Sequence, residues 1–138
     1  MNTPSLSISS LPHGSNVWAY LRNNCEDEEL AQQQAKIEAY CALHRLNLVK
    51  VFADTAKSGT SLKRRSGILE LLDQVDVPDQ RPDGLLITDI SRLGRKAKDI
   101  SFIASKLHRQ EIIIHSLKEP EFNKLFFLML EFMGEFLQ

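Results

Sequence analysis

The chain has 138 residues and a formal net charge of −1, from 17 Lys and Arg against 18 Asp and Glu. Apolar residues make up 43% and charged residues 25%, an ordinary globular composition that excludes a collagen-like repeat and wholesale disorder. At roughly 150 residues per domain, this length leaves room for one folded domain. The near-zero net charge excludes a uniformly basic coat for nucleic acid, so any functional charge must be local.

The first sixteen residues, 1–16, are rich in Ser, Asn and Pro and contain no Lys, no Arg and no long apolar run. We interpret them as a mobile tail rather than a signal peptide. The longest apolar run, Leu125 to Leu130, is too short to span a bilayer. Cys25 and Cys41 form no CxxC pair and have no His at ligand spacing, so no metal site is expected. We therefore expect a cytoplasmic protein without a membrane segment.

Short apolar runs alternate with helical patterns along the rest of the chain. Strands are expected at 17–21, 48–52, 84–90 and 112–116, and helices at 26–46, 67–75, 96–108 and from 120 onward. Asn24 is a natural N-cap for the first helix. Because each connection is long enough for a helix, the pattern predicts an α/β domain with a largely parallel sheet of four or more strands flanked by helices. Function in such sheets gathers at the carboxyl ends of the strands.

The last predicted helix, 120–138, is unusually apolar. Eleven of its residues from 122 to 138 are large and apolar, while Lys124, Glu131, Glu135 and Gln138 form one narrow polar stripe. Such a helix is either buried in its own core or packed against another subunit, and we favour the second interpretation. The expected organisation is thus a domain at 17–119 and, at 120–138, the start of a long oligomerisation helix that continues in a longer protein.

Two segments that follow predicted strands hold much of the positive charge. Residues 57–65 and 92–98 each contain four Lys or Arg and no acid, so the rest of the chain has nine basic residues against eighteen acidic ones. Arginine suits bidentate contact with phosphate, although a solvated basic rim is the simpler interpretation of either cluster alone. No GxxxxGK[ST] loop is present, so ATP use is not indicated.

Several short motifs occur in an order and spacing that resemble the serine recombinases, the resolvase and invertase family. They are Tyr20-Leu21-Arg22, Leu30-Ala31-Gln32-Gln33, Phe52-Ala53-Asp54, Ser58-Gly59, Arg65-Ser66-Gly67-Ile68-Leu69 and Ser91-Arg92-Leu93-Gly94-Arg95. The resemblance covers about 17–138. It implies a resolvase-like fold, DNA as the partner, and a homodimer or homotetramer formed through 120–138.

In that family a serine hydroxyl attacks a DNA phosphodiester and forms a 5′-phosphoserine link, without a metal or nucleotide cofactor. The resemblance implies phosphate-stabilising roles for four arginines: Arg22, Arg65, Arg92 and Arg95. It also implies supporting roles for Gln33 and Ser58, and for Asp54, whose carboxylate would orient an arginine or assist proton transfer.

The chain departs from the family pattern at two positions. Asn24 stands where the family has its serine nucleophile, and a carboxamide cannot form the phosphoester. Cys25 is a low-ranking substitute nucleophile, because using it would shift the alignment of Gln33. Ser91 stands where many members have Asp directly before the first arginine, and we expect it to bind phosphate or cap the next helix. Asp89 is interpreted as an ordinary polar residue at a strand end.

Three functions follow from these patterns. The leading hypothesis is the catalytic domain of a site-specific DNA recombinase with an altered nucleophile position. The alternative is a non-catalytic paralogue that keeps the fold and the phosphate-facing arginines and serves in DNA assembly. The third, least favoured, is an unrelated α/β domain that binds phosphate.

Overall fold

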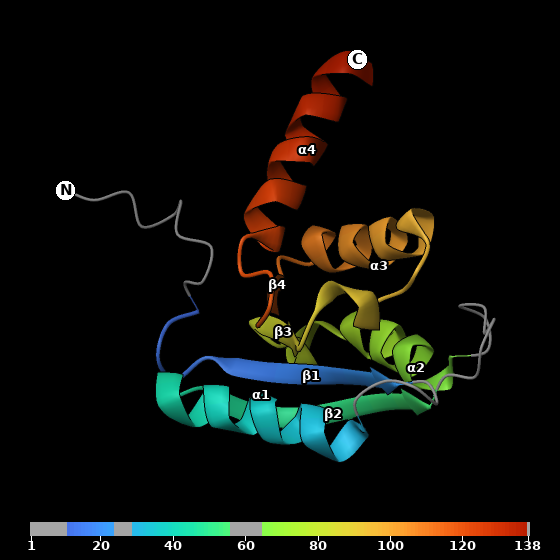
Figure 1. The fold of residues 1–138 in the computed structure, drawn as a ribbon. Coiled ribbons are helices and arrows are strands. Elements are labelled where there is room, and N and C mark those ends of the chain that lie inside the picture. Colours follow the sequence, from blue (N-terminus) through green and yellow to red (C-terminus); the bar gives the residue numbers. More distant parts are fainter. Residues whose placement is uncertain (1–10, 24–28, 56–64, 138) are drawn as a thin grey trace.

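One parallel sheet organises the molecule. The computed structural model describes residues 11–23, 29–55 and 65–137. The strands β1 (Asn16–Asn23), β2 (Asn47–Thr55), β3 (Gly84–Ile87) and β4 (Ile113–Ser116) pair in the order β2-β1-β3-β4, and every pairing is parallel (Figure 1). The predicted α/β fold with a parallel sheet is confirmed.

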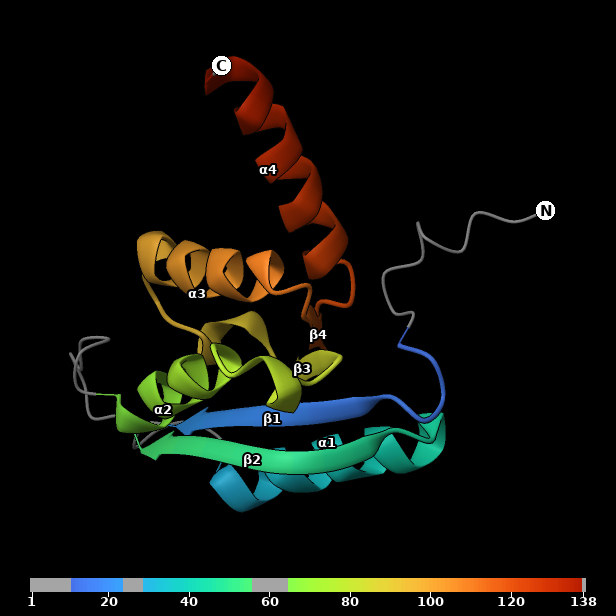
Figure 2. The ribbon, with the colours of Figure 1, turned by 180° about the vertical axis from the view of Figure 1, so that it is seen from behind.

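Helices cover both faces of this sheet. Helix α1 (Leu30–His44) lies on one face, and α2 (Ser66–Val75) and α3 (Ala97–Arg109) lie on the other (Figures 1 and 2). Because side chains alternate along a strand, β1 contributes side chains to the core on both faces of the sheet. Trp18 and Tyr20 pack with residues of α2 and α3, while Ala19 and Leu21 pack with residues of α1. Two 3-10 helices, η3 (Pro78–Gln80) and η4 (Ile90–Arg92), flank β3 in the sequence.

The start of α1 differs from the sequence prediction. Its N-cap is Glu29, not Asn24, and Glu29 and Gln32 exchange side-chain and backbone hydrogen bonds in a capping box. This reciprocal pair satisfies two amide groups that the first turn leaves unpaired, which explains why the helix begins here. Of the acidic run 26–29 that we expected in the first turn, Glu29 is the N-cap, and 26–28 lie outside the described residues.

The third strand is shorter than expected and ends at Ile87. Asp89 ends the run because its carboxylate accepts a hydrogen bond from the Ser91 backbone N–H at 3.1 Å and so caps η4. A short polar side chain that bonds the backbone two residues ahead favours a turn over a strand. The prediction that Ser91 caps the next helix is wrong, since α3 has Lys96 as its N-cap.

Residues 11–15, which the sequence assigned to the tail, contact the domain. The Gly14 N–H donates to the Arg45 carbonyl at 2.7 Å, and Leu11 packs against the core beneath α1. Gly14 has φ +90°, a conformation that glycine adopts without strain. Residues 1–10 lie outside the described part of the chain.

Helix α4 (Phe122–Leu137) projects from the body of the domain beyond β4 (Figures 1 and 2). Phe126 is buried, whereas Leu125 and Leu128 are 57% and 50% exposed. Lys124 and Glu131 of the predicted polar stripe are exposed; the side chains of Glu135 and Gln138 lie outside the described residues. Within the described ranges, no helix has the length and apolar character needed to cross a membrane.

Candidate functional site

The order of the strands places a topological switch point at the carboxyl edge of the sheet, between β1 and β3. From β1 the chain continues to β2 on one side, and β3 lies on the other, so the connections after β1 and β3 diverge there. Ligands of open parallel sheets bind at such a point. Arg22 lies at the end of β1, and Arg92 lies in η4 just after β3.

Arg65, the residue before α2, reaches β1 and the loop after β3. Its Nη1 donates to the Leu93 carbonyl at 2.7 Å and its Nη2 to the Arg92 carbonyl at 3.0 Å. Its Nε and Nη2 also donate to the Tyr20 hydroxyl, at 3.3 and 3.0 Å. The side chain is thus held by the loop after β3 and by β1, and these acceptors, two carbonyls and a hydroxyl, are neutral.

The side chains of Arg22 and Arg92 each donate a hydrogen bond to the backbone of the other's segment. Arg92 Nη1 donates to the Arg22 carbonyl at 2.8 Å, and Arg22 Nη1 donates to the Ser91 carbonyl at 3.3 Å. Gln33, buried on α1, holds the Arg22 backbone from the other face, accepting from its N–H at 3.2 Å and donating to its carbonyl at 3.0 Å. Three of the predicted arginines and Gln33 therefore belong to one network.

Asp54, at the end of β2, contacts this network through Tyr20. The Tyr20 hydroxyl donates to Asp54 Oδ2 at 2.6 Å and accepts from Arg65. Burial, together with the hydrogen bond to Asp54, outweighs the Arg65 charge and raises the pKa of Tyr20 well above its ordinary value. The hydroxyl therefore stays protonated and keeps this direction of donation.

Asp54 also fixes the start of α2. Its two carboxylate oxygens accept from the Gly67 and Ile68 backbone N–H groups at 2.7 and 2.9 Å. A Cβ at Gly67 would lie 2.3 Å from the Ala53 carbonyl oxygen, so only glycine allows α2 to approach β2 this closely. Asp54 orients Arg65 indirectly, through the Tyr20 hydroxyl and through the helix that Arg65 precedes.

Asp89 is the second carboxylate of the site. It accepts from the Ser91 hydroxyl and N–H through Oδ1, and from Arg92 Nε at 3.1 Å and Thr88 Oγ1 at 3.3 Å through Oδ2. Partial burial acts to raise the pKa of Asp89, but the Ser91 hydrogen bonds and the Arg92 charge outweigh it and hold the pKa below its usual value. Asp89 is therefore ionised at neutral pH.

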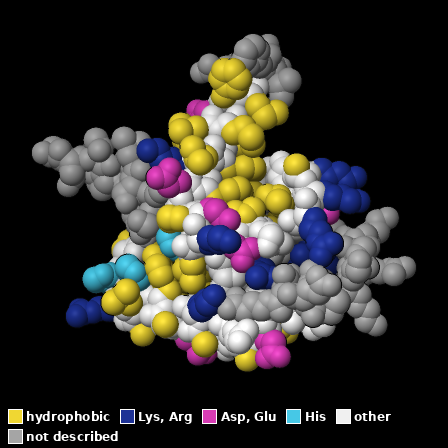
Figure 3. All heavy atoms as spheres, viewed as in Figure 1, with side chains coloured by type: hydrophobic (Ala, Val, Ile, Leu, Met, Phe, Trp, Pro, Cys, Tyr) yellow, Lys and Arg dark blue, Asp and Glu magenta, His cyan; other side chains and the backbone are white. Residues whose placement is uncertain are grey.

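Arg95 differs from the other three arginines. Arg22, Arg65 and Arg92 are only 8%, 2% and 7% exposed, whereas Arg95 is exposed on the loop before α3. Lys96 and Lys98 are exposed beside it. Figure 3 shows Lys and Arg side chains gathered near the start of α3, at the carboxyl end of the sheet. The edge thus combines a buried positive network with exposed cations on its rim.

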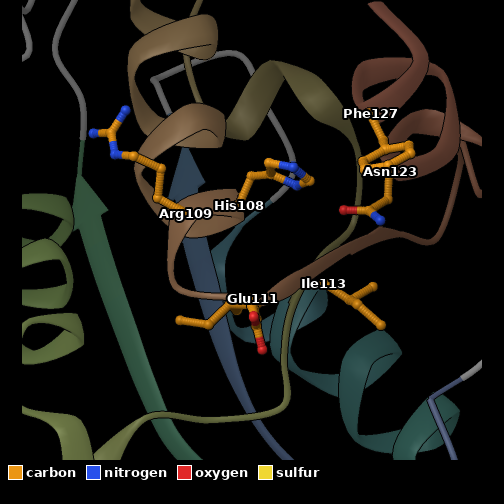
Figure 4. Close-up of a pocket in the computed structure, with 7 residues that line it drawn as sticks. His108, Arg109, Glu111, Ile113, Asn123 and Phe127 are labelled. Carbon is orange, nitrogen blue, oxygen red and sulfur yellow. The ribbon is translucent and has the colours of Figure 1, made fainter. Parts of the chain in front are cut away.

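The hollows on the described part of the chain include two of similar size. One, of about 510 Å³, lies at this edge and is lined by Thr88, Asp89 and Arg92 together with Lys36 and Lys118. The other, also of about 510 Å³, lies between the end of α3 and the first turns of α4; His108 and Phe127 are among its lining residues (Figure 4). Only the first hollow contains residues of the arginine network.

The remaining predicted positions lie outside the described residues: Asn24, Cys25 and Ser58. Among the residues that are described, no three His, Cys, Asp or Glu side chains lie together as a metal site would need.

The sequence interpretation did not predict that Tyr20 and Asp89 contact the arginines of the site. Tyr20 was part of a motif but carried no role, and its burial could have been inferred from its place in an apolar strand. Asp89 has a local signal, an Asp followed two and three residues later by Ser91 and Arg92, a spacing that suits a cap combined with an ion pair.

The comparisons with known proteins agree with this architecture, an α/β domain with an arginine network at its carboxyl edge. Residues 17–138 match the family model described as the resolvase N-terminal domain, so the chain belongs to that family of serine recombinase catalytic domains. It is 28% identical over 103 residues to the transposon Tn2501 resolvase of Escherichia coli, an alignment that covers 75% of this chain. The chain spans about half the length (50%) of that curated relative.

Solved structures share the fold. The N-terminal catalytic domain of TP901-1 integrase superposes with a TM-score of 0.73 at 20% identity, covering 88% of this chain and 95% of that one. The C-terminal catalytic domain of ISC1926 TnpA, an IS607-like serine recombinase, gives 0.64 at 24% identity, covering 83% and 76%. A resolvase family site-specific recombinase from Streptococcus pneumoniae gives 0.63 at 15% identity, covering 88% and 90%.

Proposed function

We propose that this chain is the domain of a site-specific DNA recombinase that binds a DNA phosphodiester at the carboxyl edge of its sheet. The observation that carries the proposal is the convergence of Arg22, Arg65 and Arg92 from three separate elements into one hydrogen-bonded network. Attack on a phosphodiester builds up negative charge on the phosphoryl oxygens, and fixed guanidinium groups stabilise that charge where no metal does so.

The four arginines would stabilise the phosphate in two ways, depending on how exposed each side chain is. Arg95 and the neighbouring lysines, which are exposed, would meet the DNA backbone directly. Arg22, Arg65 and Arg92 are nearly buried and would act through their field and through limited contact at the hollow that Arg92 lines. Asp54 and Gln33 would be positioning residues, since their contacts are with Tyr20, α2 and the Arg22 backbone.

A second candidate function is favoured by one observation, Asn24 at the family's nucleophile position. A carboxamide cannot be phosphorylated by this chemistry, so a chain with this residue would bind DNA and assemble with other subunits without cutting. Cys25 remains the substitute that would restore cleavage, because a thiolate is a competent nucleophile.

We further propose that the protein acts as a homodimer or homotetramer through the segment 120–138, and that a DNA-reading module elsewhere in the full protein supplies sequence specificity. Contacts to phosphate position a protein on DNA but carry no sequence information directly. The domain by itself is therefore expected to bind DNA weakly and with a strong dependence on salt.

Binding of a DNA duplex by fluorescence anisotropy, over a series of salt concentrations, tests the phosphate site. Arg95→Ala removes an exposed side chain and should lower both the affinity and the salt slope, the latter by about 1. Arg109→Ala is the matched control, because it removes the same exposed charge at the far end of α3. Equal effects from the two variants would contradict the placement of the site.

Cleavage is tested with a nicked suicide DNA substrate followed by denaturing electrophoresis. We expect no covalent adduct with the wild-type chain and an adduct with Asn24→Ser in the full-length protein. An adduct with the wild type that is lost in Cys25→Ala would instead identify the thiol as the nucleophile. If Asn24→Ser binds DNA without ever forming an adduct, the non-catalytic function is the correct one.

A further inference from the structure

The connection after β3 carries one carboxylate in direct contact with an arginine of the phosphate site. Ser91, the residue directly before Arg92, has a hydroxyl that cannot form an ion pair. Asp89 lies two residues earlier, yet its Oδ2 is 3.1 Å from Arg92 Nε. The ion pair is shielded, since the Arg92 and Asp89 side chains are only 9% and 18% exposed.

Contacts at two of its three nitrogens set the plane of the Arg92 guanidinium. Nε donates to Asp89 Oδ2 at 3.1 Å and, less closely, to Thr88 Oγ1 at 3.3 Å, and Nη1 donates to the Arg22 carbonyl at the end of β1 at 2.8 Å. Because the guanidinium is planar, holding two of its three nitrogens sets the direction of the whole group. Asp89 is itself held by Ser91 and Thr88, so the arrangement is rigid on both sides.

The two oxygens of Asp89 have separate partners. Oδ1 accepts from Ser91 and caps η4, a role that any good N-cap residue performs. Oδ2 accepts from Arg92 and Thr88, and the cap does not need these contacts. Both Asp89 and Arg92 line the hollow at the carboxyl edge, where the proposed function places the phosphate.

We propose that Asp89 is a positioning residue of the phosphate site, whose carboxylate aims the Arg92 guanidinium at the DNA phosphate while its other oxygen caps η4. The proposal rests on the proposed function, because Arg92 is taken to stabilise a phosphodiester. Asp89 does not act as a proton donor, since it is ionised at neutral pH. If Asp89 only repelled DNA, removing its charge would tighten DNA binding. If Asp89 positions Arg92, removing it weakens DNA binding, so the two roles can be told apart.

The experiment uses Asp89→Ser, which retains an N-cap side chain but is too short to pair with Arg92. Asp83→Ser is the matched control: it also removes one negative charge and one acceptor of a backbone N–H, that of Asn16 at 2.8 Å, away from the arginine network. Duplex binding is measured for both variants, for Arg92→Ala, and for Asp89→Ser combined with Arg92→Ala.

We expect Asp89→Ser to weaken DNA binding roughly three- to tenfold although it removes a negative charge, and to have no further effect when Arg92 is already Ala. Asp83→Ser should leave binding unchanged or slightly tighter. Unchanged or tighter binding by Asp89→Ser, or the same weakening in the Arg92→Ala background, overturns the proposal.

A spectroscopic readout separates this proposal from the proposed function. The Arg92 Nε–H resonance in ¹⁵N NMR spectra should exchange slowly in the wild type and in Asp83→Ser, and faster in Asp89→Ser, where the 3.3 Å contact to Thr88 Oγ1 remains but the ion pair is lost. An Arg92 signal unchanged by Asp89→Ser overturns the positioning role. A different outcome is that Asp89→Ser loses the protection of the Arg92 Nε–H, while Arg92→Ala and Arg95→Ala bind DNA as the wild type does. That result would show that Asp89 holds Arg92, but it would contradict the phosphate site and with it the proposal that Asp89 aims Arg92 at DNA.

Discussion

Buried charge in this domain is held mainly by backbone carbonyls and a tyrosine hydroxyl. Arg65 is 2% exposed and its hydrogen bonds go to Tyr20, Arg92 and Leu93. A buried cation needs such acceptors because its desolvation is costly. Contacts to both β1 and the loop after β3 explain why a residue that looks like part of a surface basic cluster in the sequence lies in the interior.

The first prediction concerns the contribution of a single residue, Asp54, to stability. Asp54→Asn should lower the free energy of unfolding by about 1–3 kcal/mol, because the amide nitrogen cannot accept one of the three hydrogen bonds that Asp54 receives. Urea unfolding measures the loss. Asp79→Asn, an exposed Asp in η3, is the control and should stay within about 0.5 kcal/mol of the wild type. Equal stabilities would show that Asp54 does not cap α2.

The second prediction is that His115 makes the stability of the domain depend on pH. It is buried on β4 with its ring 4.9 Å from that of Tyr40, and its Nδ1 has no hydrogen-bond partner among the described residues. Burial, and to a lesser extent the charge of His44, lower the pKa of His115 below its ordinary value of 6.5. The unfolded chain therefore binds the proton more readily, so stability falls as the pH drops through about 6.5.

Unfolding curves between about pH 7.5 and pH 5.5 test this dependence. His115→Gln should flatten the loss of stability on acidification, because no imidazole remains to be protonated on unfolding. His13→Gln, at an exposed position in the turn before β1, is the control and should keep the wild-type slope. A slope that survives in His115→Gln would place its origin in another group.

At the scale of elements, the base of α4 is tied to the site. Glu119, in the turn before α4, accepts from the Ile90 N–H of η4 at 2.9 Å and from the Ser116 hydroxyl at 2.5 Å. Asn123, in the first turn of α4, accepts from the Ile114 N–H of β4 at 3.0 Å. The start of the projecting helix is thus connected both to the loop that carries Arg92 and to an edge strand.

Asn123→Ala tests the second of these connections. Without the side-chain acceptor, the Ile114 amide should exchange with solvent about fivefold faster, corresponding to about 1 kcal/mol for the lost hydrogen bond. Native-state hydrogen exchange by NMR measures this rate. Lys124→Ala, an exposed neighbour in the same turn, should leave it unchanged. Similar rates in all three proteins would contradict a role for Asn123 at the strand edge.

At the scale of the whole molecule, charge and apolar surface lie in different places. Exposed cations gather at the carboxyl edge of the sheet, and α4 presents exposed apolar side chains beyond β4 (Figure 3). Contiguous apolar surface of this kind marks an interaction site. One face of the molecule thus suits a polyanion and another suits a protein partner.

The proposed self-association through α4 predicts a change in oligomeric state. Leu125→Ser combined with Leu128→Ser should shift the protein toward the monomer in sedimentation velocity, because both side chains are at least half exposed on α4. Leu43→Ser, at a leucine on α1 that is 76% exposed, is the matched control and should sediment like the wild type. Association that survives the double substitution would place the contact elsewhere.

The sequence by itself determined the parallel α/β fold, the approximate positions of its elements and the family, because apolar periodicity and short motifs are local properties of the chain. Boundaries set by a competing cap were predicted less well: Glu29 replaced Asn24 at the start of α1, and Asp89 ended β3 early. Only the tertiary structure decided that Arg22, Arg65 and Arg92 are buried together, that Tyr20 links Arg65 to Asp54, and that Asp89 pairs with Arg92. Those features depend on which strands are neighbours and how deeply each side chain is buried, which no local pattern encodes.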